Sequence, residues 1–145
     1  MRRFPSRPLP DFKCLRQALF SGIRLNSELI FFDMGRDALV FGLRALEIEP
    51  GASILIPAYM CESTIEPLRS LGYDIIFFDV QENLNFDLKM IKSLISSSDV
   101  KAILSVHYFG FACDMDALVN LCKKYGVKVI EDCSHSYLTQ ISGLS

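Results

Sequence analysis

The clearest fold signal is a strand, a helix and a second strand at residues 102–130, which read AILSVHYFGFACDMDALVNLCKKYGVKVI. Two short runs, 102–106 and 128–130, flank a segment in which Leu118 and Leu121 recur at helical spacing. Both runs are apolar continuously rather than alternately, as expected of strands that are covered on both faces. Two such strands joined through a helix predict parallel pairing.

The same alternation of strands and helices extends through the preceding part of the chain. Further apolar runs occupy residues 29–32, 53–56 and 74–80. Helical spacing recurs between the runs in three groups: Leu39, Leu43 and Leu46; Ile65, Leu68 and Leu71; Leu88, Ile91 and Ile95. Strands that alternate with helices predict an α/β fold of three layers, with a mostly parallel sheet flanked by helices.

Three residues mark where the helices begin or end. Asp87 and Asp114 stand where two helices would begin, and an aspartate there can accept hydrogen bonds from free backbone N–H groups. Gly126 follows the helix that contains Leu118, where glycine can adopt the left-handed conformation that ends a helix.

Composition excludes several classes of protein. Of the 145 residues, 50% are hydrophobic and 22% are charged, which excludes a wholly disordered chain. No apolar run approaches the roughly 20 residues of a membrane-spanning helix, and a net charge of −2 gives no footprint for nucleic acid. The five cysteines are odd in number and form no C-x-x-C pair. We therefore expect reduced thiols, no metal site, and a cytoplasmic protein that binds neither membrane nor nucleic acid.

The first 27 residues differ in charge from the rest, with six basic residues and one acidic residue. Three prolines interrupt this segment and no long apolar stretch follows, so an arm is expected rather than a targeting peptide. A short helix is predicted over residues 11–21. We therefore expect a basic arm with a short helix, residues 1–27, and an incomplete α/β domain, residues 28–145, in which no helix follows the last strand.

Gly35 and Arg36 follow the first apolar run and lead into the helix of Leu39. A glycine at a strand-to-helix turn lets the backbone approach an anion, and the start of a helix offers free N–H groups to a phosphate. A plain turn, with Asp37 placed favourably for the helix dipole, is the alternative. The chain contains no G-x-G-x-x-G or Walker motif, so a dinucleotide or P-loop site has no support.

Other polar residues follow the later strands, where ligands bind in doubly wound sheets. Tyr59 and His107 follow two of the apolar runs, and each also fits a packed core residue. Asp132 and His135 follow the last run as a carboxylate and an imidazole three residues apart, although Asp132 could instead cap a turn. The chain has no G-x-S-x-G elbow for a nucleophilic serine.

The order of these motifs is more specific than any one of them. It runs through Gly35-Arg36, Leu46-x-Ile48-x-Pro50-Gly51, Ile54-Leu55-Ile56-Pro57, Leu71-Gly72, Phe77-x-Asp79-Val80, Asn85-x-Asp87, Val106-His107-x-x-Gly110, Asp114-Met115-Asp116 and Val129-Ile130-Glu131-Asp132. In this order the chain resembles the N-terminal half of the DegT/DnrJ/StrS family of pyridoxal-phosphate-dependent sugar aminotransferases. The resemblance implies the N-terminal part of the large domain of a fold-type-I transferase.

The resemblance also assigns cofactor contacts. It implies that Asp132 pairs with the pyridine nitrogen of pyridoxal 5'-phosphate or pyridoxamine 5'-phosphate, which keeps the ring an electron sink. His135 corresponds to a residue beside the phenolic oxygen. Gly35 and Arg36 correspond to the turn that holds the phosphate, where the residues themselves suggest an anion site.

The chain departs from the family pattern at two points. Cys61 stands where the family usually stacks an aromatic ring on the cofactor, so either Tyr59 substitutes or the cofactor is held less firmly. The family's Schiff-base lysine lies well beyond the motif of Asp132, and the last lysine here is Lys128. We therefore expect no catalytic residue in this chain.

Three functions remain open. The first is the N-terminal half of an aminotransferase that moves an amino group from a donor such as glutamate to a keto-sugar nucleotide, inactive alone and homodimeric when whole. The second is a non-catalytic α/β binding or assembly module that retains the cofactor crevice. The third is a half-enzyme completed by a second chain. Dehydratases share the scaffold, and the position that distinguishes them lies outside this sequence.

Overall fold

A four-stranded parallel sheet forms the centre of the structure, which is a computed structural model that describes residues 30 and 32–136. The strands are β1 (Ser53–Pro57), β2 (Asp74–Phe78), β3 (Val100–Val106) and β4 (Lys128–Asp132). They lie in the order β2-β1-β3-β4, and each neighbouring pair is parallel. The parallel sheet expected from the apolar runs is therefore confirmed.

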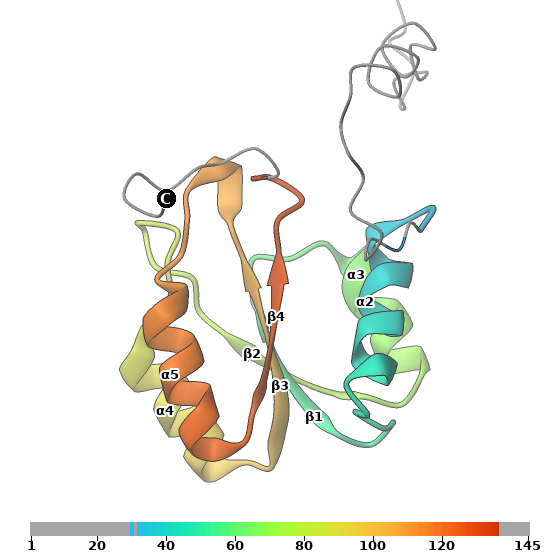
Figure 1. Cartoon of the computed structure of the whole chain (residues 1–145), viewed down its shortest axis with the longest axis horizontal. Coiled ribbons are helices and arrows are strands. Elements are labelled where there is room, and N and C mark those ends of the chain that lie inside the picture. The colour runs from blue at the N-terminus through green and yellow to red at the C-terminus, as the bar shows by residue number, and fades with distance from the viewer. Residues whose placement is uncertain (1–29, 31, 137–145) are drawn as a thin grey trace, which may run out of the picture. The chain divides into compact units, whose positions relative to one another are not determined.

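Helices cover both faces of this sheet (Figure 1). They are α2 (Gly35–Ala45), α3 (Glu62–Ser70), α4 (Leu88–Ser97) and α5 (Met115–Tyr125), and a 3-10 turn, η1, spans Tyr108–Gly110. Figure 1 shows α2 and α3 on one face and α4 and α5 on the other. The α/β fold of three layers is therefore confirmed.

The strand order reverses direction once. From β1 the chain crosses to β2 on one side, and from β2 it returns past β1 to β3 and then to β4. The reversal lies between β1 and β3. In parallel sheets of this kind, ligands bind beyond the carboxyl ends of the strands, near such a reversal.

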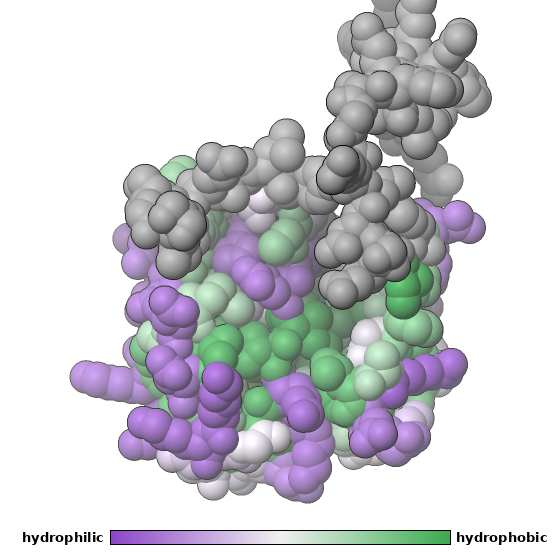
Figure 2. All heavy atoms as spheres, viewed as in Figure 1, coloured by the Kyte–Doolittle hydropathy of each residue, from purple (hydrophilic) through white to green (hydrophobic). Residues whose placement is uncertain are grey.

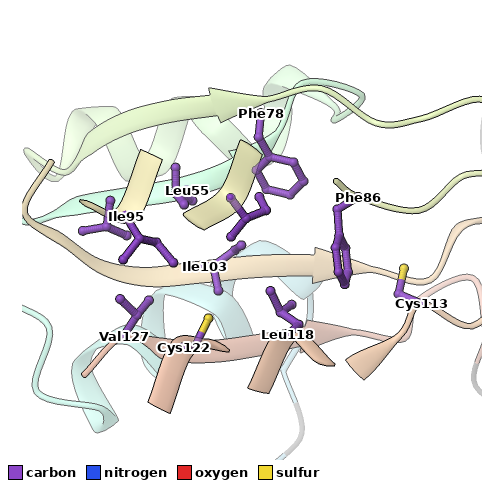
Figure 3. Packing of buried hydrophobic residues seen from close by; sticks show 11 residues of the cluster. Leu55, Phe78, Phe86, Ile95, Ile103, Cys113, Leu118, Cys122 and Val127 are labelled. Atoms are coloured by element: carbon purple, nitrogen blue, oxygen red, sulfur yellow. The ribbon is translucent and has the colours of Figure 1, made fainter. Parts of the chain in front are cut away.

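Alternating side chains of the central strands form two apolar layers. Leu55 and Ile103 belong to the layer against α4 and α5, while Ile54, Ile56 and Leu104 belong to the layer against α2 and α3. Figure 3 shows Leu55 and Ile103 between the sheet and the helices, with side chains from the helices packed around them. Because each central strand is covered on both faces, its residues are mostly apolar, although Ser105 of β3 is a buried polar residue.

The edge strands are less buried than the apolar runs suggested. Strand β4 has no buried residue, and Val129 and Ile130 are half-buried, because within the described residues it pairs with β3 alone. Figure 2 shows apolar surface near β4, between α5 and α2, with hydrophilic side chains around it. Burial on both faces therefore holds for β1 and β3 and only in part for β2 and β4.

The predicted helix ends are confirmed. The Asp87 side chain accepts hydrogen bonds from the backbone N–H groups of Lys89 and Met90, at 2.7 and 3.4 Å. Asp114 caps α5 in the same way, by accepting from the N–H of Ala117 at 3.1 Å. Gly126 follows α5 with a φ of 70°, in the left-handed region that favours glycine.

Two predicted strands differ from the structure. The run 74–80 forms a strand only as far as residue 78, and Val80 instead makes an isolated antiparallel bridge with Phe86. In the run 29–32, residues 30 and 32 lie outside any strand, and the other two lie outside the described residues. The arm and the helix predicted over 11–21 also lie outside the described residues.

Across the part of the chain that is described, no helix has the length and apolar character needed to cross a membrane.

Replacing Asp87 tests the capping of α4. Asp87→Ala removes the acceptor for two N–H groups and should lower the free energy of unfolding by ~1 kcal/mol, measured by urea denaturation. Asp87→Asn, which can still cap, should stay close to wild type. Equal loss in both variants would show that the charge matters and the hydrogen bonds do not.

Candidate functional site

A cavity of about 490 Å³ opens at the carboxyl end of the sheet, on the face covered by α2 and α3. Leu104 and Ile130 line it from the sheet, and the first turns of α2 and α3 line it from the helices. The residues after β4 close a further side. The cavity therefore lies where parallel sheets bind ligands.

The start of α2 offers a binding site for an anion on one side of the cavity. Gly35 and Arg36 line the cavity, and no side chain of the described residues caps this helix. The Arg36 guanidinium has no carboxylate partner among the described residues. A side-chain carbon added at Gly35 would meet no atom within 4 Å, so the space beside the turn is open. Free helix N–H groups and an unpaired cation together suit a phosphate.

Asp132 lines the same cavity from the end of β4. Successive side chains of a strand point to opposite faces, so the Asp132 side chain shares the face of Ile130, although Glu131 also lines the cavity. One carboxylate oxygen, Oδ1, accepts a hydrogen bond from the N–H of Ser134 at 2.9 Å. This is the turn-capping bond that the sequence allowed as an alternative. The second oxygen has no hydrogen-bond partner in the described part of the chain, so capping leaves an acceptor for a ligand.

Three predicted site residues lie outside the lining of this cavity. Tyr59 is 59% exposed, and its ring lies 5.3 Å from that of Tyr108. Cys61 is exposed at the start of α3. His135 stacks on the ring of Phe109, with 5.6 Å between ring centroids. The structure thus brings Gly35, Arg36 and Asp132 together around one cavity and leaves these three outside its lining.

Several polar residues of the cavity were not predicted from the sequence. Ser63 and Thr64 line it from the first turn of α3, and Cys133 and Ser134 line it after β4. Ser63 and Thr64 follow the end of β1 and begin a helix, which is the arrangement that singled out Gly35 and Arg36. A search for polar residues between a strand end and a helix start could therefore have identified Ser63 and Thr64.

His107 is buried and both of its ring nitrogens have hydrogen-bond partners. The interpretation of His107 as a packed core residue is therefore the one that fits. The residue is 5% exposed and its ring makes two hydrogen bonds. The N–H of Cys113 donates to Nδ1 at 2.9 Å, so Nδ1 carries no proton and Nε2 donates to the Glu131 carboxylate at 2.5 Å. The imidazole therefore has a defined tautomer.

The same histidine takes part in a cluster that the sequence did not reveal. Ligand-type atoms of His107, Glu131 and Cys133 lie within 4.8 Å of one another. A metal at Nε2 would require the ring proton on Nδ1, where it would face the N–H of Cys113. The hydrogen bonds therefore fit an imidazole that donates to Glu131 better than a metal ligand.

Burial raises the pKa of three groups near the end of the sheet, namely Tyr108, Cys113 and Cys133. It raises the pKa of Tyr108 to about 12, and the Tyr108 hydroxyl donates to the carbonyl oxygen of Tyr59 at 2.6 Å. Burial also raises the pKa of the Cys133 thiol, and the carboxylates of Glu131 and Asp132 raise it further. Cys133 therefore stays a thiol at pH values where an ordinary cysteine begins to ionise.

Residues 24–144 match the sequence profile of the DegT/DnrJ/EryC1/StrS aminotransferase family. The chain belongs to this family. Members of the family are aminotransferases that use pyridoxal phosphate. The resemblance seen in the order of the motifs is therefore confirmed, and the fold agrees with part of a fold-type-I aminotransferase.

Similar proteins act on nucleotide sugars. A UDP-N-acetyl-3-dehydro-alpha-D-glucosamine 3-aminotransferase from Acidithiobacillus ferrooxidans is 36% identical over 110 residues, which cover 75% of this chain and 30% of that protein. A UDP-4-amino-4-deoxy-L-arabinose–oxoglutarate aminotransferase from Shewanella sediminis is 35% identical over 102 residues, which cover 70% of this chain and 26% of that protein.

A solved structure, an aminotransferase from Psychrobacter cryohalolentis, is 30% identical with a TM-score of 0.68, over 77% of this chain and 28% of that one. The family member described here thus spans 20–30% of the length of these and similar curated relatives.

The raised pKa of Cys133 predicts its reactivity. Iodoacetamide reacts with thiolates, so alkylation of Cys133 should be slow near pH 7.5 and should keep accelerating as the pH rises past 9. Peptide mapping by mass spectrometry measures the rate. Cys122, which is fully buried and has a pKa of about 11, is the internal control and should stay unmodified in the folded chain. A rate at Cys133 that is already maximal at pH 7.5 would contradict the assignment.

Proposed function

We propose that the described domain holds pyridoxal 5'-phosphate, or pyridoxamine 5'-phosphate, within a sugar-nucleotide aminotransferase of which this chain is the N-terminal part. The enzyme would move an amino group from a donor such as glutamate to a keto-sugar nucleotide. One observation carries the proposal: Gly35, Arg36 and Asp132, which are far apart in sequence, line a single cavity.

The cavity suits the cofactor in size and chemistry. Its volume of about 490 Å³ lies within the roughly 300–1,000 Å³ of small-molecule sites. The cofactor needs a cationic site for its phosphate, an acceptor for its ring nitrogen and an apolar wall for its ring. Arg36 and the start of α2 supply the first, Asp132 the second, and Leu104 with Ile130 the third.

Each group has a distinct task in this proposal. Arg36 and the N–H groups of α2 bind the phosphate and anchor the cofactor. The Asp132 carboxylate accepts a hydrogen bond from the protonated ring nitrogen and stabilises its positive charge. When the cofactor is bound, its contribution is an electron sink for bond breaking at the amino-bearing carbon. The hydroxyls of Ser63 and Thr64 are further donors beside the cavity.

A lysine that would hold the cofactor covalently would have to come from outside the described residues. None of the lysines in the described part of the chain lines the cavity. Lys128 begins the strand that Asp132 ends, about 13 Å away along an extended strand. We therefore propose that the chain alone is inactive. A second polypeptide that supplies the lysine is the other candidate arrangement, and the same observation favours it.

The remaining expectations belong to the same proposal. The cofactor would also be contacted by three residues that do not line the cavity in this structure: Tyr59, Cys61 and His135. Residues 1–27 would form the basic arm, and residues 28–145 would form the incomplete large domain. The whole enzyme would be a cytoplasmic homodimer.

Asp132→Ala tests the ring-nitrogen site. Loss of a charge-assisted acceptor should weaken binding of pyridoxamine 5'-phosphate by roughly tenfold to a hundredfold, measured by isothermal titration. Pyridoxamine phosphate is the suitable ligand because it cannot form a Schiff base with surface lysines. Asp79→Ala, an exposed aspartate that follows β2, is the matched control and should bind as wild type does. Equal affinity for wild type and Asp132→Ala would remove Asp132 from the site.

Arg36→Gln tests the phosphate site independently. The variant should bind pyridoxamine phosphate roughly tenfold more weakly, because a charge-assisted bond to the phosphate is lost. Its affinity for pyridoxamine, which lacks the phosphate, should change by less than about twofold. Arg44→Gln, in the last turn of the same helix, is the control and should leave both affinities unchanged. A similar loss for both ligands would place Arg36 elsewhere in the site or in the fold.

A further inference from the structure

We infer that His107 is a positioning residue for Asp132, which it holds in place through Glu131 and through the backbone of β4. The inference rests on the proposed function, because it concerns how the carboxylate that meets the ring nitrogen is kept in place. His107 itself does not line the cavity.

Three hydrogen bonds connect His107 to its surroundings. Its backbone N–H donates to the carbonyl oxygen of Asp132 at 3.1 Å. Its Nε2 donates to the Glu131 carboxylate at 2.5 Å, and its Nδ1 accepts from the N–H of Cys113 at 2.9 Å. One residue therefore binds both residues at the end of β4 and also the far end of the loop that follows β3.

These bonds constrain the direction in which Asp132 points. Glu131 and Asp132 share a planar peptide unit, so fixing the Glu131 side chain and the Asp132 carbonyl leaves little freedom for the backbone between them. The end of β4 needs such support, because β4 pairs with β3 alone within the described residues. Beyond it, only the bond to the N–H of Ser134 holds the Asp132 side chain among those residues.

The ring of His107 is well suited to this task. It is buried and its side chain is 6% exposed, while the Glu131 side chain is 48% exposed. A buried imidazole with its tautomer set by Cys113 offers a proton in one fixed direction, and a carboxylate that would otherwise be solvated takes it. The next residue, Tyr108, ties the same loop to the loop after β1 through the carbonyl of Tyr59. The His107 bonds therefore belong to a connected set of loops at the end of the sheet.

Two substitutions separate the hydrogen bonds of the ring. In His107→Asn, the side-chain oxygen can replace Nδ1 as the acceptor for Cys113, while the donor to Glu131 is lost. In His107→Gln, the side-chain amide can replace Nε2 as the donor to Glu131. His107→Asn should therefore disturb the position of the Asp132 carboxylate. His107→Gln, which keeps a donor to Glu131, should largely preserve that position.

A pair of ligands separates positioning of Asp132 from a general structural role. Pyridoxamine phosphate carries the ring nitrogen, and its 1-deaza analogue has a carbon at that position and cannot pair with Asp132. Affinities of the full chain for both ligands are measured by isothermal titration. His107→Asn should weaken binding of pyridoxamine phosphate by roughly threefold to tenfold and binding of the analogue by less than about twofold. Glu131→Ala should do the same, and the double variant should lose little more than either single one.

Asp132→Ala, measured with the same two ligands, separates the two proposals. If it weakens both ligands equally or neither, the proposed function is overturned and the inference falls with it. If Asp132→Ala affects only pyridoxamine phosphate but His107→Asn weakens both ligands equally or neither, the inference alone is overturned. Failure of His107→Gln to recover affinity would also overturn the inference, because the hydrogen bond to Glu131 would then not be what positions Asp132.

Discussion

Parallel pairing of β1, β3 and β4 is the constraint on which the rest of this structure depends. Parallel neighbours cannot be joined by a tight turn, so each connection crosses a face of the sheet as a helix. Because the strands run in the same direction, their carboxyl ends lie at one edge. The starts of α2 and α3 contribute to the cavity at that edge together with the end of β4. Polar groups from distant segments therefore meet where no single segment could bind a ligand.

The end of β4 serves two faces of the sheet at once. Both Glu131 and Asp132 line the cavity, but because side chains alternate along a strand they point to opposite faces, and the Glu131 carboxylate accepts a hydrogen bond from His107. The carboxylate of Asp132 keeps an oxygen without a partner in the described residues, and that of Glu131 is engaged by a buried imidazole. One strand end can thus present one carboxylate to a ligand while the other stabilises the strand.

Local features were predictable because they depend on a few neighbouring residues. Asp87 and Asp114 cap their helices through N–H groups two or three residues away, and Gly126 ends a helix through its own backbone conformation. Largely apolar runs identified β1 and β3, because burial on both faces favours apolar side chains, with Ser105 of β3 as a buried polar exception. The apolar runs of β2 and β4 predicted more burial than these strands have, because an edge strand has a neighbour on one side only.

The composition of the candidate site was only partly predictable. Patterns along the chain were enough to propose Gly35, Arg36 and Asp132 as ligand-facing residues, since strand ends and helix starts are visible in the sequence. Which strand ends share a cavity depends on strand order and register, and these follow from packing over the whole sheet. The link from His107 to Glu131 spans 24 positions in the sequence and arises because β3 pairs with β4 in one register. Such contacts belong to the tertiary structure, because side chains that are distant along the chain meet only when the strands between them have paired.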